Sequence, residues 1–279
     1  FSKMGFDTFT SKELMNITEY TPNGSWPTDD ILVSETMKTF DATPDQSDFT
    51  YIITVGTHGD YPKEPVIENP TYTVSGVEDE GMKNAWTYYV NQLNEADRFI
   101  KELTDELSKR DEDTIVVMFG DHLPTMGLQD SDMKSGDIYK TKYITWNNMG
   151  LPKEDADLYA YQLLAQTTDT VGIHGKSGPN IICVLLESFC DPDEINFLQV
   201  NEDPIPTFHE LEKNYSSGYL NVPVVGAGTA NTEFEMLTGL SMQYFGTGEY
   251  PYKTILKQTD CESIASDLSK IGYATHVVH

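Results

Sequence analysis

Four short segments of the chain are apolar almost without interruption and contain many β-branched residues. This pattern is typical of strands that are covered by helices on both faces. The segments are Phe49–Val55, Thr114–Phe119, Ile181–Leu186 and His276–Val278. We therefore expect these four segments to form parallel strands of one sheet.

Other stretches repeat their apolar residues at helical spacing. The longest is Met82–Lys109, where the repeat continues over several turns. Shorter helices are expected at Asp155–Thr168, Thr207–Asn214, Glu233–Leu240 and Cys261–Ile271. Strands that alternate with helices predict an α/β fold, doubly wound, with a mostly parallel central sheet and helices on both faces.

The length of 279 residues and a hydrophobic content of 38% allow a sizeable core. One large domain or two small ones would fit, and we expect a single domain over residues 1–279. Only Thr170–Pro179 resembles a junction. No apolar run is long enough for a transmembrane helix and no signal peptide is visible, so we expect a soluble protein or the soluble part of a larger one.

The charge of the chain limits its partners. It has 45 acidic and 18 basic residues, a formal net charge of −27, which opposes broad contact with nucleic acid or an anionic bilayer. An anionic partner would need a local site such as a bound divalent cation, which can invert the local field. The three cysteines show no CxxC spacing, so the sequence suggests neither a zinc knuckle nor a dense disulfide framework.

Polar residues follow the expected strands at the points where these strands end. Glu187 follows one strand directly, Asp121 and His122 follow another after a glycine, and His58 and His279 end the remaining two. Because the carboxyl ends of parallel strands share one edge of an open sheet, these groups can converge there.

Two carboxylates and an imidazole, from Glu187, Asp121 and His122, suit Mn²⁺, Mg²⁺ or Zn²⁺. One such residue alone at a strand end is more often a loop or capping residue than a ligand. The set of three, with Asp121 and His122 adjacent in a tight turn, makes a metal site the better interpretation.

A fourth ligand is suggested by the segment Val225–Glu235, where glycines precede Thr229 at an expected helix start. Exposed amides and the helix dipole favour a phosphate there, and a metal can make the Thr229 hydroxyl nucleophilic. The alternative is that Thr229 or Thr232 simply caps the helix. The segment by itself leaves the two interpretations evenly balanced.

Four motifs carry a family resemblance. They are LLESF at 185–189, GTANTEFE at 228–235, THGDYP at 57–62 and FGDHLP at 119–124. As a set they resemble the signature segments of lipoteichoic acid synthases and related phosphoglycerol transferases, in the alkaline phosphatase and sulfatase superfamily. Weaker similarity covers almost the whole chain.

The resemblance implies that Glu187, Thr229, Asp121 and His122 bind one divalent cation, for which it favours Mn²⁺. It implies that Thr229 attacks the phosphorus of a phosphatidylglycerol head group and expels diacylglycerol. A hydroxyl of a glycolipid or of a polyglycerol phosphate chain then accepts the glycerol phosphate. His58 matches a position that contacts the substrate phosphate or assists proton transfer.

The resemblance further places His279 near another substrate contact. It implies a monomeric domain on the extracellular face of the cell membrane, anchored through a transmembrane part that this sequence lacks.

The order of the motifs departs from the family. There LLESF comes first and FGDHLP last, so the family order would be about residues 178–279 followed by 1–174. The family also has a substrate-gripping loop that is missing here between His279 and Phe1. We infer a circular permutant or two pieces joined out of order, with substrate affinity in doubt and the metal site intact.

Other functions remain open. A sulfatase or phosphodiesterase of the same superfamily is one, although a sulfatase needs an oxidisable Cys or Ser where Thr229 stands. A phosphoethanolamine transferase usually has several disulfides and further zinc ligands, for which three cysteines give little support. A metal-stabilised binding module without catalysis is the alternative from another class, but three fixed ligands plus a hydroxyl suggest an open site.

Overall fold

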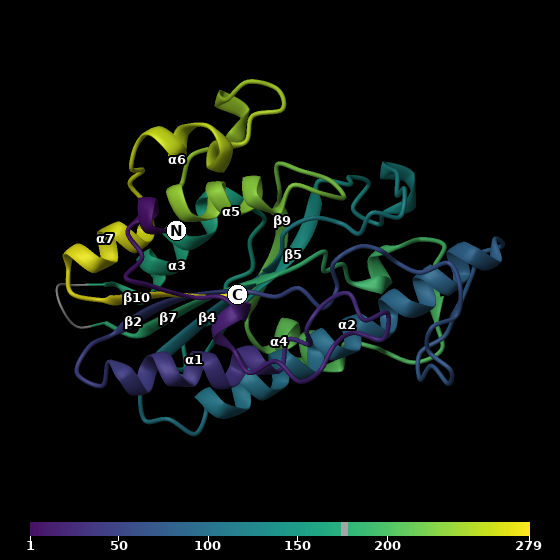
Figure 1. The fold of residues 1–279 in the computed structure, drawn as a ribbon, viewed down its shortest axis with the longest axis horizontal. Coiled ribbons are helices and arrows are strands. Elements are labelled where there is room, and N and C mark those ends of the chain that lie inside the picture. Colours follow the sequence, from purple (N-terminus) through teal and green to yellow (C-terminus); the bar gives the residue numbers. More distant parts are fainter. Residues whose placement is uncertain (174–177) are drawn as a thin grey trace.

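The computed structural model describes residues 1–173 and 178–279, and its centre is a sheet of eight strands (Figure 1). The strand order is β1-β10-β2-β7-β4-β5-β9-β6. In that order the strands are Thr8–Thr10, Ala274–Val278, Asp48–Ile53, Asn180–Leu186, Thr114–Gly120, Lys140–Asn147, Ser216–Asn221 and Leu158–Tyr159. A separate antiparallel pair joins β3, Val74–Ser75, to β8, Gln199–Val200.

The four expected strands are β10, β2, β7 and β4, and they are neighbours in the sheet. They run parallel to one another, as does β1 at the edge. Beyond β4 the direction changes, because β5 is antiparallel to β4 and β9 is antiparallel to β5. The expectation of a mostly parallel sheet is confirmed, with an antiparallel portion on one side that the sequence analysis did not anticipate.

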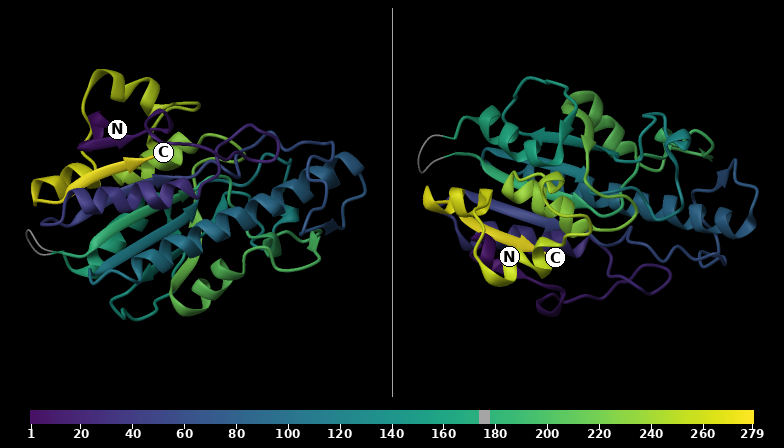
Figure 2. Two further views of the ribbon diagram at one scale, coloured as in Figure 1. Left: turned by 60° about the horizontal axis from the view of Figure 1, so that its bottom comes forward. Right: turned by 90° about the horizontal axis from the view of Figure 1, so that it is seen from above.

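Helices cover both faces of the sheet (Figures 1 and 2). On one face lie α1, α2 and α4, which span Ile31–Ala42, Glu80–Leu107 and Pro206–Asn214. On the other lie α3, α5, α6 and α7, which span Ala160–Val171, Thr229–Thr238, Ile255–Gln258 and Ile264–Lys270. Neighbouring strand residues alternate between the two cores, so Val116 packs with α2 and Val117 with α3. This confirms the doubly wound α/β fold.

Some helix boundaries differ from those expected. The helix expected from Asp155 begins at Ala160, because the preceding residues run extended along β9, where Asp155 accepts a hydrogen bond from the backbone of Ser217. The helix expected from Cys261 begins at Ile264, after Ser263 caps it. Helix α1 was not expected, because its apolar positions give only a weak helical stripe.

The remaining elements are short. One-turn 3₁₀ helices lie at Ser2–Met4, Lys12–Leu14, Asp130–Asp132, Pro192–Glu194, Met242–Tyr244 and Pro251–Lys253. The stretch expected as a junction, Thr170–Pro179, lies between α3 and β7, and its residues 174–177, with His174, fall outside the described residues. Within the described ranges, no helix combines the length and apolar character needed to cross a bilayer.

Candidate metal and nucleophile site

The side chains of Glu187, Asp121, His122 and Thr229 meet at the carboxyl edge of β7 and β4. The Thr229 Oγ1 atom lies 3.0 Å from Glu187 Oε2 and 3.3 Å from His122 Nε2. His122 Nε2 lies 3.3 Å from Asp121 Oδ2 and 3.5 Å from Glu187 Oε1. Ligand atoms of the two acids and the histidine all fall within 4.8 Å of one another. Residues more than a hundred positions apart thus form one constellation.

The end of β4 positions His122. Gly120 leaves room for the turn, because a Cβ there would stand 2.4 Å from the carbonyl oxygen of Phe189. His122 Nδ1 lies 2.9 Å from the carbonyl oxygen of Leu123. Since a carbonyl oxygen can only accept, Nδ1 carries the hydrogen, and Nε2 of the neutral ring turns its lone pair toward the other side chains.

Asp121 is completely buried, and only one of its two carboxylate oxygens has hydrogen-bond partners among the described residues. Its Oδ1 accepts hydrogen bonds from the backbone N–H groups of Ser188 and His122, at 2.8 and 2.9 Å. Its Oδ2 has no hydrogen-bond partner among the described residues. Burial, reinforced by the negative charge of Glu187, raises the pKa of Asp121 well above its ordinary value.

An unpartnered buried oxygen beside a second carboxylate and an imidazole lone pair is suited to a cation. The donor set of Asp121, His122 and Glu187 therefore fits a divalent metal ion, with the Thr229 hydroxyl as a further oxygen. Carboxylate, imidazole and hydroxyl together do not select one ion among Mn²⁺, Mg²⁺ and Zn²⁺.

Glu187 is held from the neighbouring strand. Its backbone N–H donates to the hydroxyl of Thr54 at 2.9 Å, and the hydroxyl of Thr57 donates to its carbonyl oxygen. Ser188 has a positive φ of 49°, and its hydroxyl donates to Glu187 Oε1 at 2.9 Å. This left-handed backbone at a residue other than glycine is costly and turns the chain just after the carboxylate. The sequence analysis did not single out Ser188.

Thr229 is the first residue of α5 and follows Gly228, whose φ of 103° suits only glycine. Neither Thr229 nor Thr232 caps α5 with its side chain, so the capping interpretation is wrong. The Thr229 hydroxyl instead donates to Glu187, and the Thr232 hydroxyl donates to the carbonyl oxygen of Asp121 at 2.9 Å. Thr232 therefore ties the start of the helix to the turn that carries the candidate ligands Asp121 and His122.

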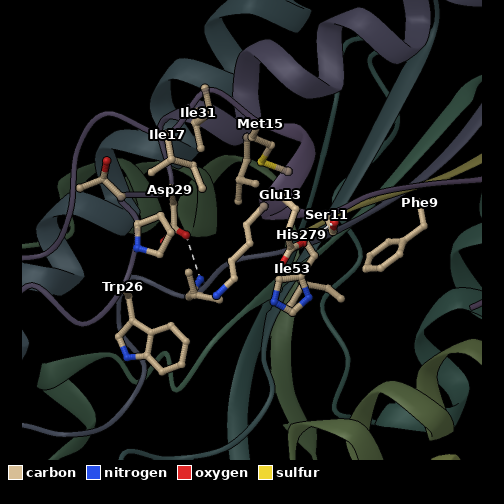
Figure 3. Close-up of a pocket in the computed structure, with 15 residues that line it drawn as sticks. Phe9, Ser11, Glu13, Met15, Ile17, Trp26, Asp29, Ile31, Ile53 and His279 are labelled. Atoms are coloured by element: carbon tan, nitrogen blue, oxygen red, sulfur yellow. Dashed lines mark hydrogen bonds between the residues drawn. The ribbon is translucent and has the colours of Figure 1, made fainter.

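The two remaining predicted site residues lie beside this constellation. His279 lines a cavity of about 270 Å³ with Trp26 and Asp29 (Figure 3). Burial by the surrounding atoms lowers the pKa of His279, although the charge of Glu187 opposes the shift. His58 is exposed, with its ring centroid 4.6 Å from that of Trp26. In the described ranges, no hydrogen bond or ion pair joins His58 or His279 to the candidate ligands.

Asp29 is a site residue that sequence reasoning missed. Its two carboxylate oxygens accept the backbone N–H groups of Val55 and Gly56, at 2.8 and 3.0 Å. Burial raises its pKa to about 7, against the effect of these two hydrogen bonds. Asp29 thus fixes the turn after β2 that carries His58. It stands directly before Asp30 in a loop without a motif, so no local signal marks it.

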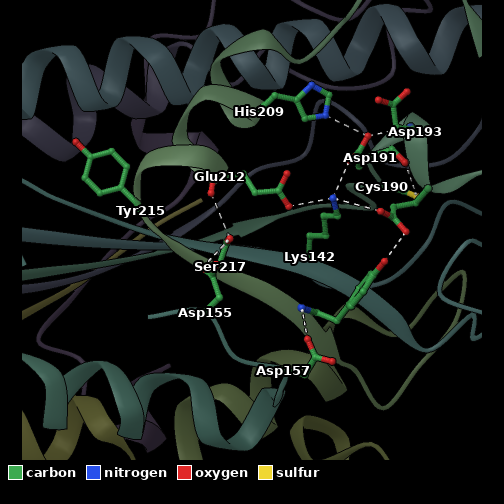
Figure 4. A network of polar contacts seen from close by, with 12 residues as sticks. Lys142, Asp155, Asp157, Cys190, Asp191, Asp193, His209, Glu212, Tyr215 and Ser217 are labelled. Carbon is green, nitrogen blue, oxygen red and sulfur yellow. Dashed lines mark hydrogen bonds and ion pairs between the residues drawn. The ribbon is translucent and has the colours of Figure 1, made fainter. Parts of the chain in front are cut away.

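A second acidic cluster contains Asp191, Asp193 and His209 (Figure 4). The Lys142 ammonium lies 3.0 Å from Asp191 and 3.0 Å from Glu212, and His209 lies 3.3 Å from Asp191. Although burial opposes it, these two cations lower the pKa of Asp191 to about 2. The cluster therefore already contains its counterions, and we assign it no metal.

His209 is a histidine that the sequence analysis did not single out. It is partly buried between Asp191 and Asp203. Its hydrogen bond to Asp191 outweighs burial and raises its pKa to about 9. Helix α4 is thereby attached to the segment that follows Glu187.

The sequence is similar to known proteins. The protein-family profile described as Sulfatase matches residues 1–170 and 179–279, and the gap between the two matched parts lies within the expected junction. A "Putative cyclic beta-1,2-glucan modification protein" of Rhizobium meliloti (strain 1021) is 32% identical over 108 residues. That match covers 39% of this chain and 16% of the relative, so the chain spans a small part of that protein. No solved structure matches the chain significantly.

Proposed function

The chain belongs to the sulfatase family, and we propose that it is a metal-dependent phosphoglycerol transferase with Thr229 as its nucleophile. The observation that carries the proposal is the position of the Thr229 hydroxyl. It lies at the start of a helix, 3.0 Å from Glu187 and 3.3 Å from His122, beside the unpartnered oxygen of Asp121. A hydroxyl placed in this way has a cation site on one side and a helix N-terminus suited to phosphate on the other.

Glu187, Asp121, His122 and Thr229 would hold the divalent cation, and we propose Mn²⁺ because the four sequence motifs resemble a manganese-dependent family. When bound, such an ion lowers the pKa of a hydroxyl and offsets charge on a phosphoryl group. Glu187 accepts the hydrogen bond of the Thr229 hydroxyl, so its Oε2 is the nearest oxygen to the proton that leaves the nucleophile.

The proposed reaction has two steps. In the first, Thr229 Oγ1 forms a bond to the phosphorus of phosphatidylglycerol and the bond to the diacylglycerol oxygen breaks. That oxygen takes up a proton, for which His58 is the proposed donor, and a glycerophosphoryl group stays on Thr229. In the second, an acceptor hydroxyl attacks the phosphorus, loses its proton and displaces Thr229 Oγ1.

Three acceptors suit this chemistry. A glycolipid or a polyglycerol phosphate chain would make the protein part of lipoteichoic acid synthesis, outside the cell and close to the membrane. A glucan is the third, because the related protein is named for modification of a cyclic glucan. His58 and His279 are proposed substrate contacts. His279 lines the cavity of Figure 3 and is within reach of the charge of Glu187, and the ring of His58 packs against Trp26, which lines the same cavity.

The rival functions are less well supported. A sulfatase requires an oxidisable side chain in place of Thr229, whose hydroxyl carbon carries a methyl group. A phosphodiesterase would use the same first step and water as the acceptor. For a phosphoethanolamine transferase, disulfides are expected, yet Cys183, Cys190 and Cys261 are all free thiols. A non-catalytic binding module gives no reason for a hydroxyl directed at the cation site.

The test is a release assay with a fluorescent phosphatidylglycerol. The parental chain with Mn²⁺ should release diacylglycerol and carry one glycerophosphoryl group on Thr229, detected by mass spectrometry. Thr229→Ala should lose both signals, and a chelator should abolish release. Thr238→Ala is the matched control, because Thr238 ends the same helix and its hydroxyl bonds only backbone groups of Phe234 and Leu240. Equal release by Thr229→Ala and the parental chain would end the proposal.

A further inference from the structure

A second, larger concavity lies at the same edge of the sheet. It is a groove of about 720 Å³ bordered by the start of α3, the end of β9, one face of α5 and the loop 241–249. Strand register places its floor at the edge that carries the metal-ligating turn, because Lys140 pairs with Asn221 and Asn221 pairs with Tyr159. Strands β4 to β6 span about 14 Å at the usual strand spacing, the length of a few sugar rings.

The groove and the nucleophile share helix α5. Asn231 lines the groove and stands two residues after Thr229, about 3 Å further along the helix axis and on a different face of the helix. Glu235, one turn later, lines the groove too. A molecule lying in the groove would therefore reach Thr229 by passing around the N-terminus of α5.

Asn231 is the observation that indicates a ligand. Asn231 is only 9% exposed, and its Nδ2 donates to the carbonyl oxygen of Glu249 at 3.1 Å. Its Oδ1 is buried and has no partner among the described residues. A buried amide oxygen without a donor is costly, and rotation of the Asn231 side chain would present this oxygen to a hydroxyl group in the groove.

The walls combine aromatic rings with uncharged or acidic polar groups. Tyr139 and Tyr159 are 48% and 52% exposed, and the ring of Tyr159 is stacked on that of Tyr161, with 5.3 Å between centroids. Tyrosine offers an apolar ring face for the C–H face of a sugar and a hydroxyl for its O–H groups. Asn221 and Gln243 add amides that can both donate and accept.

The charge of the groove selects among acceptors. Its described lining residues include Asp137, Glu235 and Glu249 but neither lysine nor arginine. A chain of phosphates would meet like charge here, in a protein whose net charge is already −27. A neutral, hydroxyl-rich molecule meets no such repulsion.

We propose that this groove binds the acceptor, and that the acceptor is a neutral oligosaccharide. The inference rests on the proposed function, because it places the acceptor relative to Thr229. It favours glycan over polyglycerol phosphate as the group that receives glycerol phosphate. A sugar hydroxyl of this molecule then attacks the phosphorus on Thr229, the bond from phosphorus to Thr229 Oγ1 breaks, and the proton lost by the sugar hydroxyl passes to Oγ1, which leaves as the threonine hydroxyl.

The first experiment measures binding and needs neither donor nor turnover. A neutral β-linked glucose hexasaccharide and a glycerol phosphate oligomer are titrated separately into the full chain by calorimetry. The parental chain should bind the hexasaccharide more tightly than the oligomer. The double variant Tyr139→Ala/Tyr159→Ala should weaken hexasaccharide binding by roughly tenfold or more, since it removes two ring faces. Tyr244→Ala is the control, because Tyr244 is 83% exposed and does not line the groove.

The second experiment measures the ratio of glycerophosphoryl transfer to diacylglycerol release, which should fall in the double variant and stay unchanged in Tyr244→Ala. Absence of hexasaccharide binding, equal binding by the double variant, or preference for the oligomer overturns the groove assignment. Hexasaccharide binding without any diacylglycerol release leaves the groove assigned and refutes the phosphoglycerol transfer, so the two failures are distinguishable.

Discussion

The metal site makes an unusual prediction about stability, because the metal-free protein contains a buried carboxylate that nothing neutralises. Replacing Asp121 by Asn should stabilise the metal-free protein. The asparagine Oδ1 can keep both backbone hydrogen bonds, and its Nδ2 takes the place of the unpartnered Oδ2, 3.3 Å from the lone pair of His122 Nε2. The substitution therefore adds a hydrogen bond to His122 that the parental chain lacks.

The magnitude follows from the unpartnered oxygen. Leaving a buried acceptor without a donor costs about 1 to 3 kcal/mol, and here the negative charge of Glu187 adds to that cost. We therefore expect Asp121→Asn to stabilise the metal-free protein by about 2 kcal/mol, a rise in melting temperature of about 4 °C for a chain of this size.

The pH dependence has a definite sign. The folded pKa of Asp121 is raised, so its penalty is absent below the unfolded pKa near 3.8 and grows as the pH rises toward the folded value. The difference between Asp121→Asn and the parental chain should therefore vanish near pH 4 and widen toward neutrality. With saturating Mn²⁺ the order should reverse, because only the parental chain gains stability from the ion.

The assay is thermal unfolding in chelator and in Mn²⁺ across this pH range. Asp29→Asn is the matched control, for which we expect the opposite change in stability. Both oxygens of Asp29 accept backbone N–H groups, so the same substitution turns one acceptor into a donor facing a donor and should cost about 1 to 3 kcal/mol. If Asp121→Asn lowers the metal-free melting temperature, or keeps the stabilisation by Mn²⁺, the assignment of Asp121 as a ligand is wrong.

Two further predictions concern the supports of the site. Because the pKa of His209 is raised from 6.5 to about 9, its contribution to the free energy of unfolding is complete below pH 6.5 and is lost as the pH rises through 9. In the parental chain this loss should amount to about 1 to 2 kcal/mol after screening by solvent, and in His209→Gln it should be absent. Urea unfolding curves measured across that pH range test this, and the same pH dependence in both proteins would contradict it. Gly120→Ala should cost more than about 2 kcal/mol and weaken Mn²⁺ binding in calorimetry, because its Cβ would stand 2.4 Å from the carbonyl oxygen of Phe189. Normal Mn²⁺ affinity in that variant would show that the turn tolerates the displacement.

Much of the architecture could be read from local patterns. The four central strands are fully buried, so each is an apolar run without alternation, and such runs are visible in one dimension. The long helix was equally clear, since its apolar stripe persists over 28 residues. Strands β5 and β9 were missed because they are only partly buried and lack that uniform pattern. The apolar pattern alone placed helix α5 four residues late, and only the glycines before Thr229 indicated its true start.

The sequence by itself determined which residue types follow the strands, and the rule that parallel strands share an edge was enough to predict that Glu187, Asp121 and His122 would meet. Thr229 joined this set through the resemblance of four motifs to a known family. Only the tertiary structure decided what supports these residues. Asp29, Ser188 and the Lys142 cluster act through partners distant in the chain or through an unusual backbone angle, and no local pattern records either. The groove proposed for the acceptor has the same origin, because its walls come from separate segments that become neighbours only when the sheet has formed.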